Sequence, residues 1–463
     1  MKRRDFLKFA GAAGAGSALS LLPAMKLYAN HDGYTGPLWL TVEARGGWDP
    51  TSLCDPKGNQ PLDRGSNRPP SPVNRYDAAQ IGNAGNILYA PPPPIYQSGG
   101  ALFDANIYTA AQFFNATHNG VPNYQRMLVL NGIHHKTNSH SAGQQNSWSG
   151  ELGRPGYPNF SALVAGTVGS GRGIPFITNG GYDSTGGLVA PTRLNNNGIR
   201  ALYEIAYPER ATPNSGTSRL YFDSGTESLL RTAINNRHQR LLAAQNLTRL
   251  QNAISDLVAA RQDPGHLRDL TTLLETVQDL DLNTFFSGRR RARDLYRQGR
   301  VALAAYESGV TASAHIVIGG YDTHGDHDER HHPRLMDMLL GVEGIIQQAY
   351  DRGLEDRLFI FIGSDFGRTN RYNDGNGKDH WAVTSAMFWA APSFFTGNRV
   401  VGQTDAYHNT VRLNTGTLQP DANGVQLQCY HVHHALRNLA GVNAPPEFRL
   451  NANAAVDNLQ IFT

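Results

Sequence analysis

Five short runs of apolar residues along the chain predict buried β-strands. They cover residues 38–42, 127–130, 314–318, 358–362 and 383–389. Between the third and fourth runs, apolar side chains recur at helical spacing from Leu335 to Ala349, which predicts an amphipathic helix. A strand, a helix and a strand in that order form a βαβ unit. The sequence therefore predicts an α/β fold in which helices flank a mostly parallel central sheet.

Two stretches depart from this pattern. Residues 50–100 are rich in Pro, Gly and Asn, and Pro91 to Pro94 exclude a regular helix or a central strand there, so we expect an irregular surface excursion. Residues 224–305 instead carry helical stripes over 247–257 and 267–277, separated by a break at 263–265. We expect a helical insertion over 224–305, in which Ser224 and Glu227 form a capping box. Its arginine run at 289–293 is typical of a solvated face, with anion binding as the alternative.

The N-terminus has the features of an export signal. Arg3 and Arg4 are followed by Phe-Leu-Lys and a mildly apolar Ala/Gly-rich stretch, a combination that resembles a twin-arginine signal peptide. We predict a signal over residues 1–29 with cleavage after Ala29, a single domain over 30–463, and export by the twin-arginine machinery to the periplasm or beyond. In that compartment Cys54 and Cys429 are able to pair, but their spacing does not show whether they meet.

The net charge of the chain limits the classes of partner that it is expected to bind. Of the formal net charge of +3, residues 1–29 contribute five basic side chains against Asp5, which leaves −1 for residues 30–463. A nearly neutral chain gives no electrostatic basis for binding nucleic acid or an anionic membrane. No run of 18 apolar residues follows the signal, so the sequence predicts no membrane span.

Histidine is concentrated beside acidic residues. Eight of the seventeen histidines lie in three short segments, at 134–140, 324–332 and 380. In open α/β sheets, ligands bind at the carboxyl ends of strands. Five places fit that edge: Asp49, the 134–140 segment, the 322–327 segment, Asp365, and Asp379-His380 before the fifth strand. Carboxylate and imidazole ligands suit zinc or a similar divalent ion, although each feature alone is more commonly a helix cap, a turn or a paired histidine.

The order of these motifs resembles the alkaline-phosphatase superfamily. Within it, five motifs resemble one exported family, catalogued as domain of unknown function 1501. They are Gly46-Gly47-Trp48-Asp49, Ser139-His140, Gly320-Tyr321-Asp322-Thr323-His324, Ser364-Asp365-Phe366-Gly367-Arg368-Thr369 and Asp379-His380. The resemblance covers nearly the whole chain after the signal and is most specific over 319–390.

The superfamily implies a two-metal hydrolase of phosphate or sulfate esters. By position, one ion would be held by Asp322, His380 and either His324 or His327. Asp49 and Asp365 would hold a second ion, with a hydroxyl nucleophile between them. Ser139 is the first candidate for that nucleophile and Thr137 the second. The resemblance implies one or two divalent ions, zinc first, with manganese, calcium and magnesium as alternatives.

Several departures bear on this expectation. Phe366 stands where the superfamily commonly has His, which removes a ligand of the second ion, and Pro50 follows Asp49 where the exported family has Gly. No Cys-x-Pro-x-Arg motif is present, which excludes formylglycine chemistry. Two interpretations therefore stay open. One is a hydrolase of an anionic small-molecule or polymer ester, and the other is a non-catalytic, metal-stabilised protein that binds other cell-surface proteins.

Basic side chains near the motifs are candidates for binding the ester. Lys136 and Lys378 are two of only three lysines after the signal, and both lie in or beside the histidine-rich segments. We hypothesise that they, together with His140, contact an anionic ligand. Arg368 is a candidate for the same role in catalysis, with an ion pair to Asp365 as its alternative.

Overall fold

A computed structural model describes most of the chain after the signal. The described residues are 34–63, 69–169, 172–194, 196–207, 209–212, 215–246, 264–450 and 459–463. The export signal and the predicted helix over 247–257 lie outside them. No helix among these described segments is both long and apolar enough to cross a membrane.

An eight-stranded sheet forms the centre of the molecule, in the order β10-β9-β11-β1-β12-β15-β8-β16. Its strands are β1 (Leu38–Arg45), β8 (Met127–His134), β9 (Phe176–Thr178), β10 (Pro191–Arg193), β11 (Ser313–Gly319), β12 (Leu358–Ser364), β15 (Val383–Trp389) and β16 (Arg399–Val401). All five strands predicted from apolar runs are present. The parallel pairings of β10 through β12 confirm the mostly parallel sheet, and β15 is the one strand that runs antiparallel to its neighbours.

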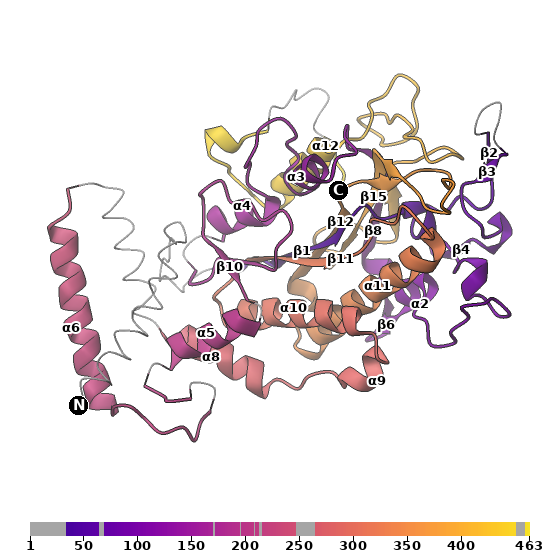
Figure 1. Ribbon diagram of the computed structural model, residues 1–463. Coiled ribbons are helices and arrows are strands. Elements are labelled where there is room, and N and C mark those ends of the chain that lie inside the picture. Colours follow the sequence, from indigo (N-terminus) through magenta and orange to yellow (C-terminus); the bar gives the residue numbers. More distant parts are fainter. Residues whose placement is uncertain are drawn as a thin grey trace.

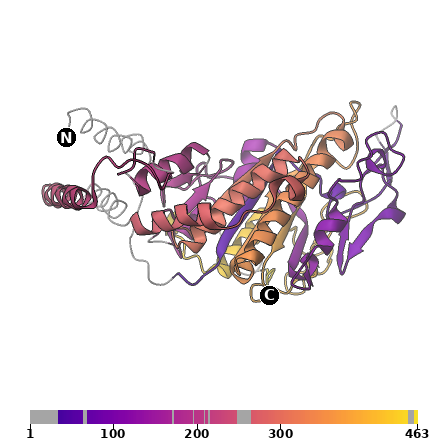
Figure 2. The ribbon, with the colours of Figure 1, turned by 90° about the horizontal axis from the view of Figure 1, so that it is seen from below.

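Helices cover both faces of this sheet (Figure 1). One face carries α3 (His140–Ser149), α4 (Phe160–Gly166) and α12 (Cys429–Leu439). The other carries α2 (Ala110–Asn115), α10 (Arg290–Glu307) and α11 (His327–Asp351). Figure 2 shows α10 and α11 lying side by side beneath the sheet. The helix predicted over 335–349 is the central part of α11.

Side chains that point alternately to the two faces of the sheet form a separate hydrophobic core on each face. Leu38, Leu40 and Val42 of β1 pack in the cluster that contains α10 and α11. Trp39, between them, packs on Phe160 of α4 and on Phe359 of β12. Because side chains alternate along a strand, both faces of a central strand must be apolar when helices cover both. This explains why the sequence shows continuous apolar runs.

The described part of residues 196–307 is mostly helical. Beside α10 it contains α5 (Asn196–Ala206), α6 (Ser224–Ala243), α8 (Pro264–Thr276) and α9 (Leu282–Phe286), and α6 stands apart from the sheet at the left of Figure 1. The predicted capping box is wrong, because the N-cap of α6 is Asp223, whose carboxylate accepts the Thr226 N–H. Within this region α10 packs directly on β11 and α11. The last helix of the region therefore belongs to the layer that covers the sheet.

In the described part of the Pro-rich stretch, residues 50–63 and 69–100, the elements are short. The hairpins β2 (Pro61–Leu62) with β3 (Ser71–Pro72), and β4 (Gly82–Ala84) with β5 (Ile87–Tyr89), alternate with single 3₁₀ turns. A further hairpin pairs β6 (Thr117–His118) with β7 (Val121–Pro122). Cys54 and Cys429 are both buried and unpaired, so they do not form the disulfide that export would allow.

Candidate metal centre at the carboxyl edge of the sheet

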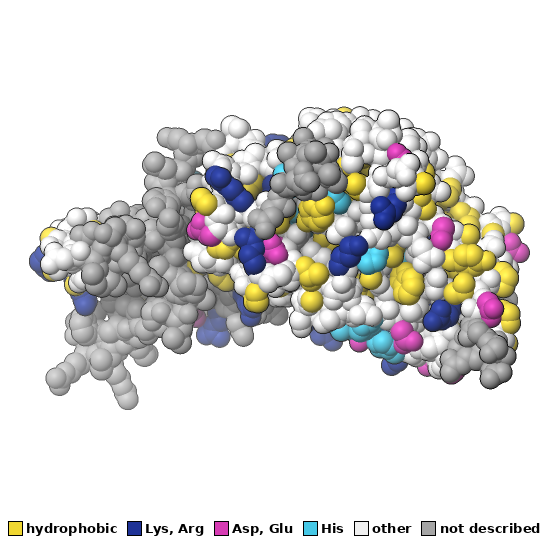
Figure 3. Space-filling view, turned by 90° about the horizontal axis from the view of Figure 1, so that it is seen from above, with side chains coloured by type: hydrophobic (Ala, Val, Ile, Leu, Met, Phe, Trp, Pro, Cys, Tyr) yellow, Lys and Arg dark blue, Asp and Glu magenta, His cyan; other side chains and the backbone are white. Residues whose placement is uncertain are grey.

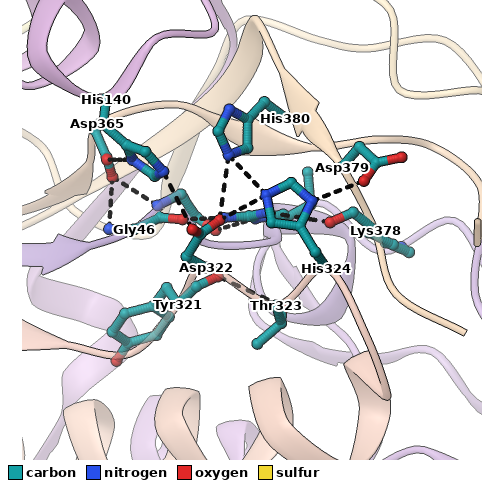
Figure 4. Close-up of polar contacts among 12 residues, drawn as sticks. Gly46, His140, Tyr321, Asp322, Thr323, His324, Asp365, Lys378, Asp379 and His380 are labelled. Carbon is teal, nitrogen blue, oxygen red and sulfur yellow. Dashed lines mark hydrogen bonds and ion pairs between the residues drawn. The ribbon is translucent and has the colours of Figure 1, made fainter. Parts of the chain in front are cut away.

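Side chains from four strand ends meet at one edge of the sheet (Figure 4). Asp322 and His324 follow β11, Asp365 follows β12, and His140 opens α3 after β8. His380 precedes β15, in a short hairpin of β13 (Gly367–Arg368) with β14 (His380–Trp381). Because β15 is antiparallel, the residues before it lie at the carboxyl edge of the other strands. That orientation brings His380 to the same place as the loops after the parallel strands.

The Asp322 carboxylate is the centre of this group. Its Oδ1 lies 3.0 Å from His324 Nε2 and 3.2 Å from His380 Nε2. Its Oδ2 lies 3.4 Å from His140 Nε2. The Nε2 atoms of His324 and His380 are themselves 3.0 Å apart. We call Asp322 and these three histidines the outer cluster.

Each imidazole of the outer cluster is oriented through its other nitrogen. His324 Nδ1 lies 2.7 Å from Asp379 Oδ1, His140 Nδ1 lies 2.6 Å from Asp365 Oδ2, and His380 Nδ1 lies 2.7 Å from the carbonyl oxygen of Asn138. Those three oxygens only accept hydrogen bonds, so each Nδ1 carries the proton. In the neutral rings, every Nε2 therefore presents a lone pair to the Asp322 carboxylate. Three lone pairs and a carboxylate converging on one point form a candidate site for a cation.

This donor set fits a divalent metal ion. Among the described residues, His140, Asp322 and His380 form a group that could hold a metal ion, and His324 Nε2 lies 3.0 Å from both Asp322 Oδ1 and His380 Nε2. Zinc bonds of about 2.0–2.1 Å imply ligand atoms about 3.3–3.4 Å apart in a tetrahedron, and Asp322 lies at close to this spacing from His140 and His380, at 3.4 and 3.2 Å. Metal-ligating histidines usually donate their second N–H to a carboxylate or a carbonyl, as all three do here. The four side chains are only partly buried, which leaves the centre open to small molecules.

A glycine turn anchors the centre from below. The Asp365 carboxylate accepts the N–H groups of Gly46 and Gly47 at 2.9 and 2.6 Å, while Arg368 donates to both of their carbonyls. The two glycines have φ values of +121° and +81°, and a Cβ atom would come within 2.6 Å of the Asp322 nitrogen or 2.4 Å of the Phe366 ring. Only glycine fits both positions. The turn therefore fixes Asp365, and through it His140.

Arg368 and Phe366 complete the support. Arg368 is fully buried and donates to Asp322 Oδ1 at 2.7 Å, as well as to the Lys378 carbonyl. The Phe366 ring packs against His140 and His380, with centroids 4.8 and 4.4 Å away. Both residues hold ligands in place from within the protein.

Electrostatics keep the carboxylates of the centre ionised. Partial burial alone would raise the pKa of Asp322, but the hydrogen bond and charge of Arg368 lower this pKa to about 2. Burial likewise opposes ionisation of Asp365, and its bonds to His140 and to the Gly46 N–H lower the pKa. The Asp365 hydrogen bond raises the pKa of His140.

A second group of histidines and a carboxylate lies deeper in the protein. Asp49 is completely buried, and its Oδ2 bonds Lys378 Nζ at 2.7 Å and His327 Nε2 at 3.1 Å. Thr323 Oγ1 lies 2.9 Å from His327 Nδ1 and 3.0 Å from His331 Nδ1. We call Asp49, Thr323, His327, His331 and Lys378 the inner cluster.

Every imidazole nitrogen in the inner cluster has a hydrogen-bond partner. The Asp49 N–H donates to His331 Nε2 at 2.9 Å, so His331 carries its proton on Nδ1 and donates it to Thr323. The Thr323 hydroxyl then donates to His327 Nδ1, and His327 Nε2–H donates to the Asp49 carboxylate. This closed circuit leaves no lone pair for a metal ion. Burial lowers the pKa of both histidines, which keeps them neutral.

The two clusters divide the site residues predicted from the sequence. Asp322, His324 and His380 come together as the first ion site requires, whereas His327 and Asp49 lie in the inner cluster. Asp365 contacts His140 rather than Asp49, so the two carboxylates expected to share a second ion are both bound to internal partners. The Lys378 ammonium is buried against Asp49 and Thr51, which turns it away from any external ligand.

The remaining predicted residues, Lys136, Thr137 and Ser139, lie in the loop between β8 and α3. Lys136 is exposed and its ammonium contacts Gln426 Oε1. Ser139 is the N-cap of α3, yet its hydroxyl makes no capping bond to the helix. Thr137 Oγ1 accepts the Ser139 N–H at 3.2 Å.

Sequence reasoning missed three features of this site. From the sequence, His140 is assigned to the substrate, although its Nε2 faces Asp322, and Asp379 is given no role of its own, although it orients His324. The Gly46-Gly47 turn was quoted only as a motif. An available signal was the pairing of each ligand histidine with an acidic residue, since Asp379 directly precedes His380 in the sequence.

A cavity of about 490 Å³ opens beside His380. Its lining also includes His134, Asn138, Trp381, Asn409 and Gln426. On the molecular face seen in Figure 3, Lys and Arg side chains are scattered and do not gather into one basic patch.

Fold and site together define an exported α/β protein with a histidine–carboxylate centre at the carboxyl edge of its sheet. Residues 39–419 match the family described as protein of unknown function DUF1501, and the chain belongs to that family. Residues 1–20 match the twin-arginine translocation signal, so the protein is exported to the periplasm or secreted. Both assignments confirm what the sequence motifs predicted.

Similarity to individual proteins is remote. No curated protein matches the chain. One similar solved structure is Ps i-CgsB in complex with k-i-k-neocarrahexaose, with 7% identity and a TM-score of 0.34 over 92% of this chain and 76% of that one. Another is BT1596, a 2-O GAG sulfatase, with 9% identity and a TM-score of 0.33 over 92% and 74%. TM-scores below 0.5 give these two likenesses no weight in assigning a function.

Proposed function

We propose that this protein is an exported hydrolase of a phosphate- or sulfate-type ester that depends on one divalent ion, zinc first, held by the outer cluster. The observation that carries the proposal is the convergence of three oriented Nε2 atoms on the Asp322 carboxylate at an open edge of the sheet. The order of the motifs, which resembles the alkaline-phosphatase superfamily, supports the type of reaction. A bound divalent ion would polarise an oxygen of the ester as a Lewis acid.

The chain's own groups have distinct roles in this proposal. Asp365 and Asp379 hold the Nδ1 protons of His140 and His324, so both rings keep their Nε2 atoms directed at the centre. Arg368 fixes Asp322 and the Gly46-Gly47 turn from within the protein, as a positioning residue. The N-terminus of α3 directs its first N–H groups toward the anionic ester and stabilises negative charge there.

Ser139 is the proposed nucleophile. It directly precedes His140 at the N-terminus of α3, it is exposed, and its hydroxyl is not used to cap the helix. A serine in the N-cap position usually bonds the backbone of the first turn, and one that does not is free to react. Thr137 is the alternative, although its Oγ1 accepts the Ser139 N–H.

The experiment is ester hydrolysis by purified, zinc-loaded protein, with 4-nitrophenyl phosphate and 4-nitrophenyl sulfate as substrates. We expect release of nitrophenol from at least one ester, and loss of that activity by about 10³-fold in Ser139→Ala, with the bound zinc retained. Ser141→Ala is the matched control, because it removes another exposed hydroxyl from the first turn of α3. Full activity in Ser139→Ala would refute its role, and no hydrolysis of either ester by the zinc-loaded protein would refute the reaction.

A non-catalytic, metal-stabilised binding protein is the second candidate. It is favoured by one observation: Asp49 and Asp365, the expected ligands of a second ion, are both bound to internal partners. In that case zinc would raise the melting temperature without conferring hydrolysis of any ester.

A further inference from the structure

The cavity beside His380 has a lining without a charged side chain. Besides His380 it is formed by His134, Asn138, Thr369, Trp381, Ala382, Val383, Asn409, Thr410 and Gln426. Its volume of about 490 Å³ falls within the usual range for small-molecule sites. Because His380 belongs to both the lining and the outer cluster, a group bound in the cavity lies next to the proposed centre of hydrolysis.

An indole ring supplies an apolar surface in this cavity. Trp381 donates its ring N–H to the His408 carbonyl at 3.2 Å, so its hydrogen-bonding capacity is already used. What remains for a ligand is the apolar body of the ring, together with Ala382 and Val383. Such a surface binds the C–H face of a ring-shaped ligand.

Around the indole, polar side chains keep unused hydrogen-bonding groups. Gln426 Oε1 accepts from the Lys136 ammonium, which leaves the Gln426 amide NH₂ free to donate. His134 Nδ1 accepts the Lys136 N–H at 3.0 Å, so His134 Nε2 carries a proton, and burial lowers the pKa of this ring and keeps it neutral. Asn409 uses its NH₂ on Asp405, and its Oδ1 is available to accept.

This combination distinguishes between kinds of ligand. A purely apolar group, such as an aryl ring, would cover these amides and the His134 N–H without pairing them, which is unfavourable for each group left without a partner. An anionic group would find no cation in the lining. A neutral sugar ring has an apolar C–H face for the indole and hydroxyls that pair with the amides.

We propose that this cavity binds a neutral sugar residue. The inference rests on the proposed function for its catalytic meaning, since the sugar would then carry the ester that is cleaved at the outer cluster. Trp381 and Gln426 are its specificity-determining residues, and Lys136 acts by orienting the Gln426 amide rather than by contacting an anion.

Saturation-transfer NMR tests the proposal with methyl glucoside, methyl galactoside and methyl mannoside as neutral probes. Benzyl alcohol and glucuronate serve as the apolar and anionic probes. We expect at least one methyl glycoside to bind better than both other probes, and its affinity to fall at least tenfold in Trp381→Ala. Gln426→Glu is the second variant, because it keeps the side-chain shape, removes the NH₂ donor and does not disturb the core. Tyr407→Ala, which removes an exposed aromatic ring that is not part of the lining, should bind as the wild type does.

The results separate this inference from the proposed function. The proposal is overturned when no methyl glycoside binds, when benzyl alcohol or glucuronate binds better, or when Trp381→Ala and Gln426→Glu both bind as the wild type does. Asp322→Ala should abolish zinc binding and leave glycoside binding in place. Glycoside binding without ester hydrolysis would thus refute the reaction and support the cavity, and zinc-dependent hydrolysis without glycoside binding would do the reverse.

Discussion

The outer and inner clusters are built from the same residue types and differ in how their protons are used. Both place histidines around an aspartate, and both lie where the loops after β1 and β11 meet the 369–380 segment. In the inner cluster each nitrogen has a partner of opposite character, and Lys378 neutralises Asp49. In the outer cluster the Nδ1 atoms are paired and the Nε2 atoms face one another. The paired hydrogen bonds of the inner cluster stabilise the fold, whereas the converging Nε2 lone pairs of the outer cluster form a candidate site for a cation.

Exposure follows the same division. The side chains of Asp49 and Lys378 are 0% exposed, whereas those of Asp322 and His324 are 46% and 48% exposed. A buried ion pair is costly to break because the remaining charge is left without water, and an exposed group loses little when its partner is removed. The loss of a charged partner should therefore cost much more stability in the inner cluster than in the outer cluster.

The largest expected difference is in stability. Lys378→Met leaves the Asp49 carboxylate buried without its cation, and we expect the free energy of unfolding to fall by about 3–5 kcal/mol. His324→Ala in the outer cluster should change it by no more than about 0.5 kcal/mol. Urea unfolding of both variants in the presence of a chelator measures the two values. Equal losses would show that the clusters do not differ in the way that their hydrogen bonds imply.

Acidification should also affect the two clusters differently, with a smaller change in the free energy of unfolding than Lys378→Met causes. Burial lowers the pKa of His327 and His331, and lowers that of the adjacent His332 to about 3, so all three stay neutral in the folded protein. Below pH 6.5 the unfolded chain binds protons that the folded chain does not. Each such histidine therefore costs up to about 1.4 kcal/mol of unfolding free energy per pH unit as the pH falls from 6.5 toward its folded pKa.

His332 is the residue with which to measure this effect. It makes no hydrogen bond among the described residues, and its ring packs against Tyr96, so His332→Phe removes the titration without opening the inner circuit. We expect this variant to lose less stability than the wild type between pH 6.5 and pH 5. His140 in metal-free protein is the opposite case, because its pKa is raised in the folded state. Its protonated ring contributes stability that is present at low pH and is lost as the pH rises. His140→Gln should therefore change the pH dependence of the unfolding free energy in the opposite direction to His332→Phe. If the unfolding free energies of His332→Phe and the wild type depended on pH in the same way, the conclusion that buried His332 stays neutral in the folded protein would be wrong.

The apolar runs were sufficient to predict the architecture. Continuous rather than alternating runs predicted strands covered on both faces, and the structure has them in β1, β8, β11, β12 and β15. The short strands β9, β10 and β16 were missed, because three residues at or near the edge of a sheet carry no apolar period of their own. The antiparallel direction of β15 was also missed, since strand direction depends on the path of the chain and leaves no local pattern.

The sequence predicted which residues of the outer cluster come together, but not which side chains pair with one another. The sequence brought Asp322, His324 and His380 together because each follows or precedes a strand. It could not show that Asp49 would be neutralised by Lys378, since 329 positions separate the two residues and only the packed loops bring them into contact. Nor could it show that Asp365 orients His140, because that role depends on which nitrogen of the ring faces the carboxylate.

We expect the outer cluster to bind one metal ion and the inner cluster to bind none. Metal content per chain, measured by plasma mass spectrometry on exported protein purified without chelator, distinguishes the two clusters. We expect about one equivalent of zinc, lost in Asp322→Ala and retained in Thr323→Val, which opens the inner circuit without removing an outer ligand. No metal in the wild type, or one equivalent that survives Asp322→Ala, would contradict the claim.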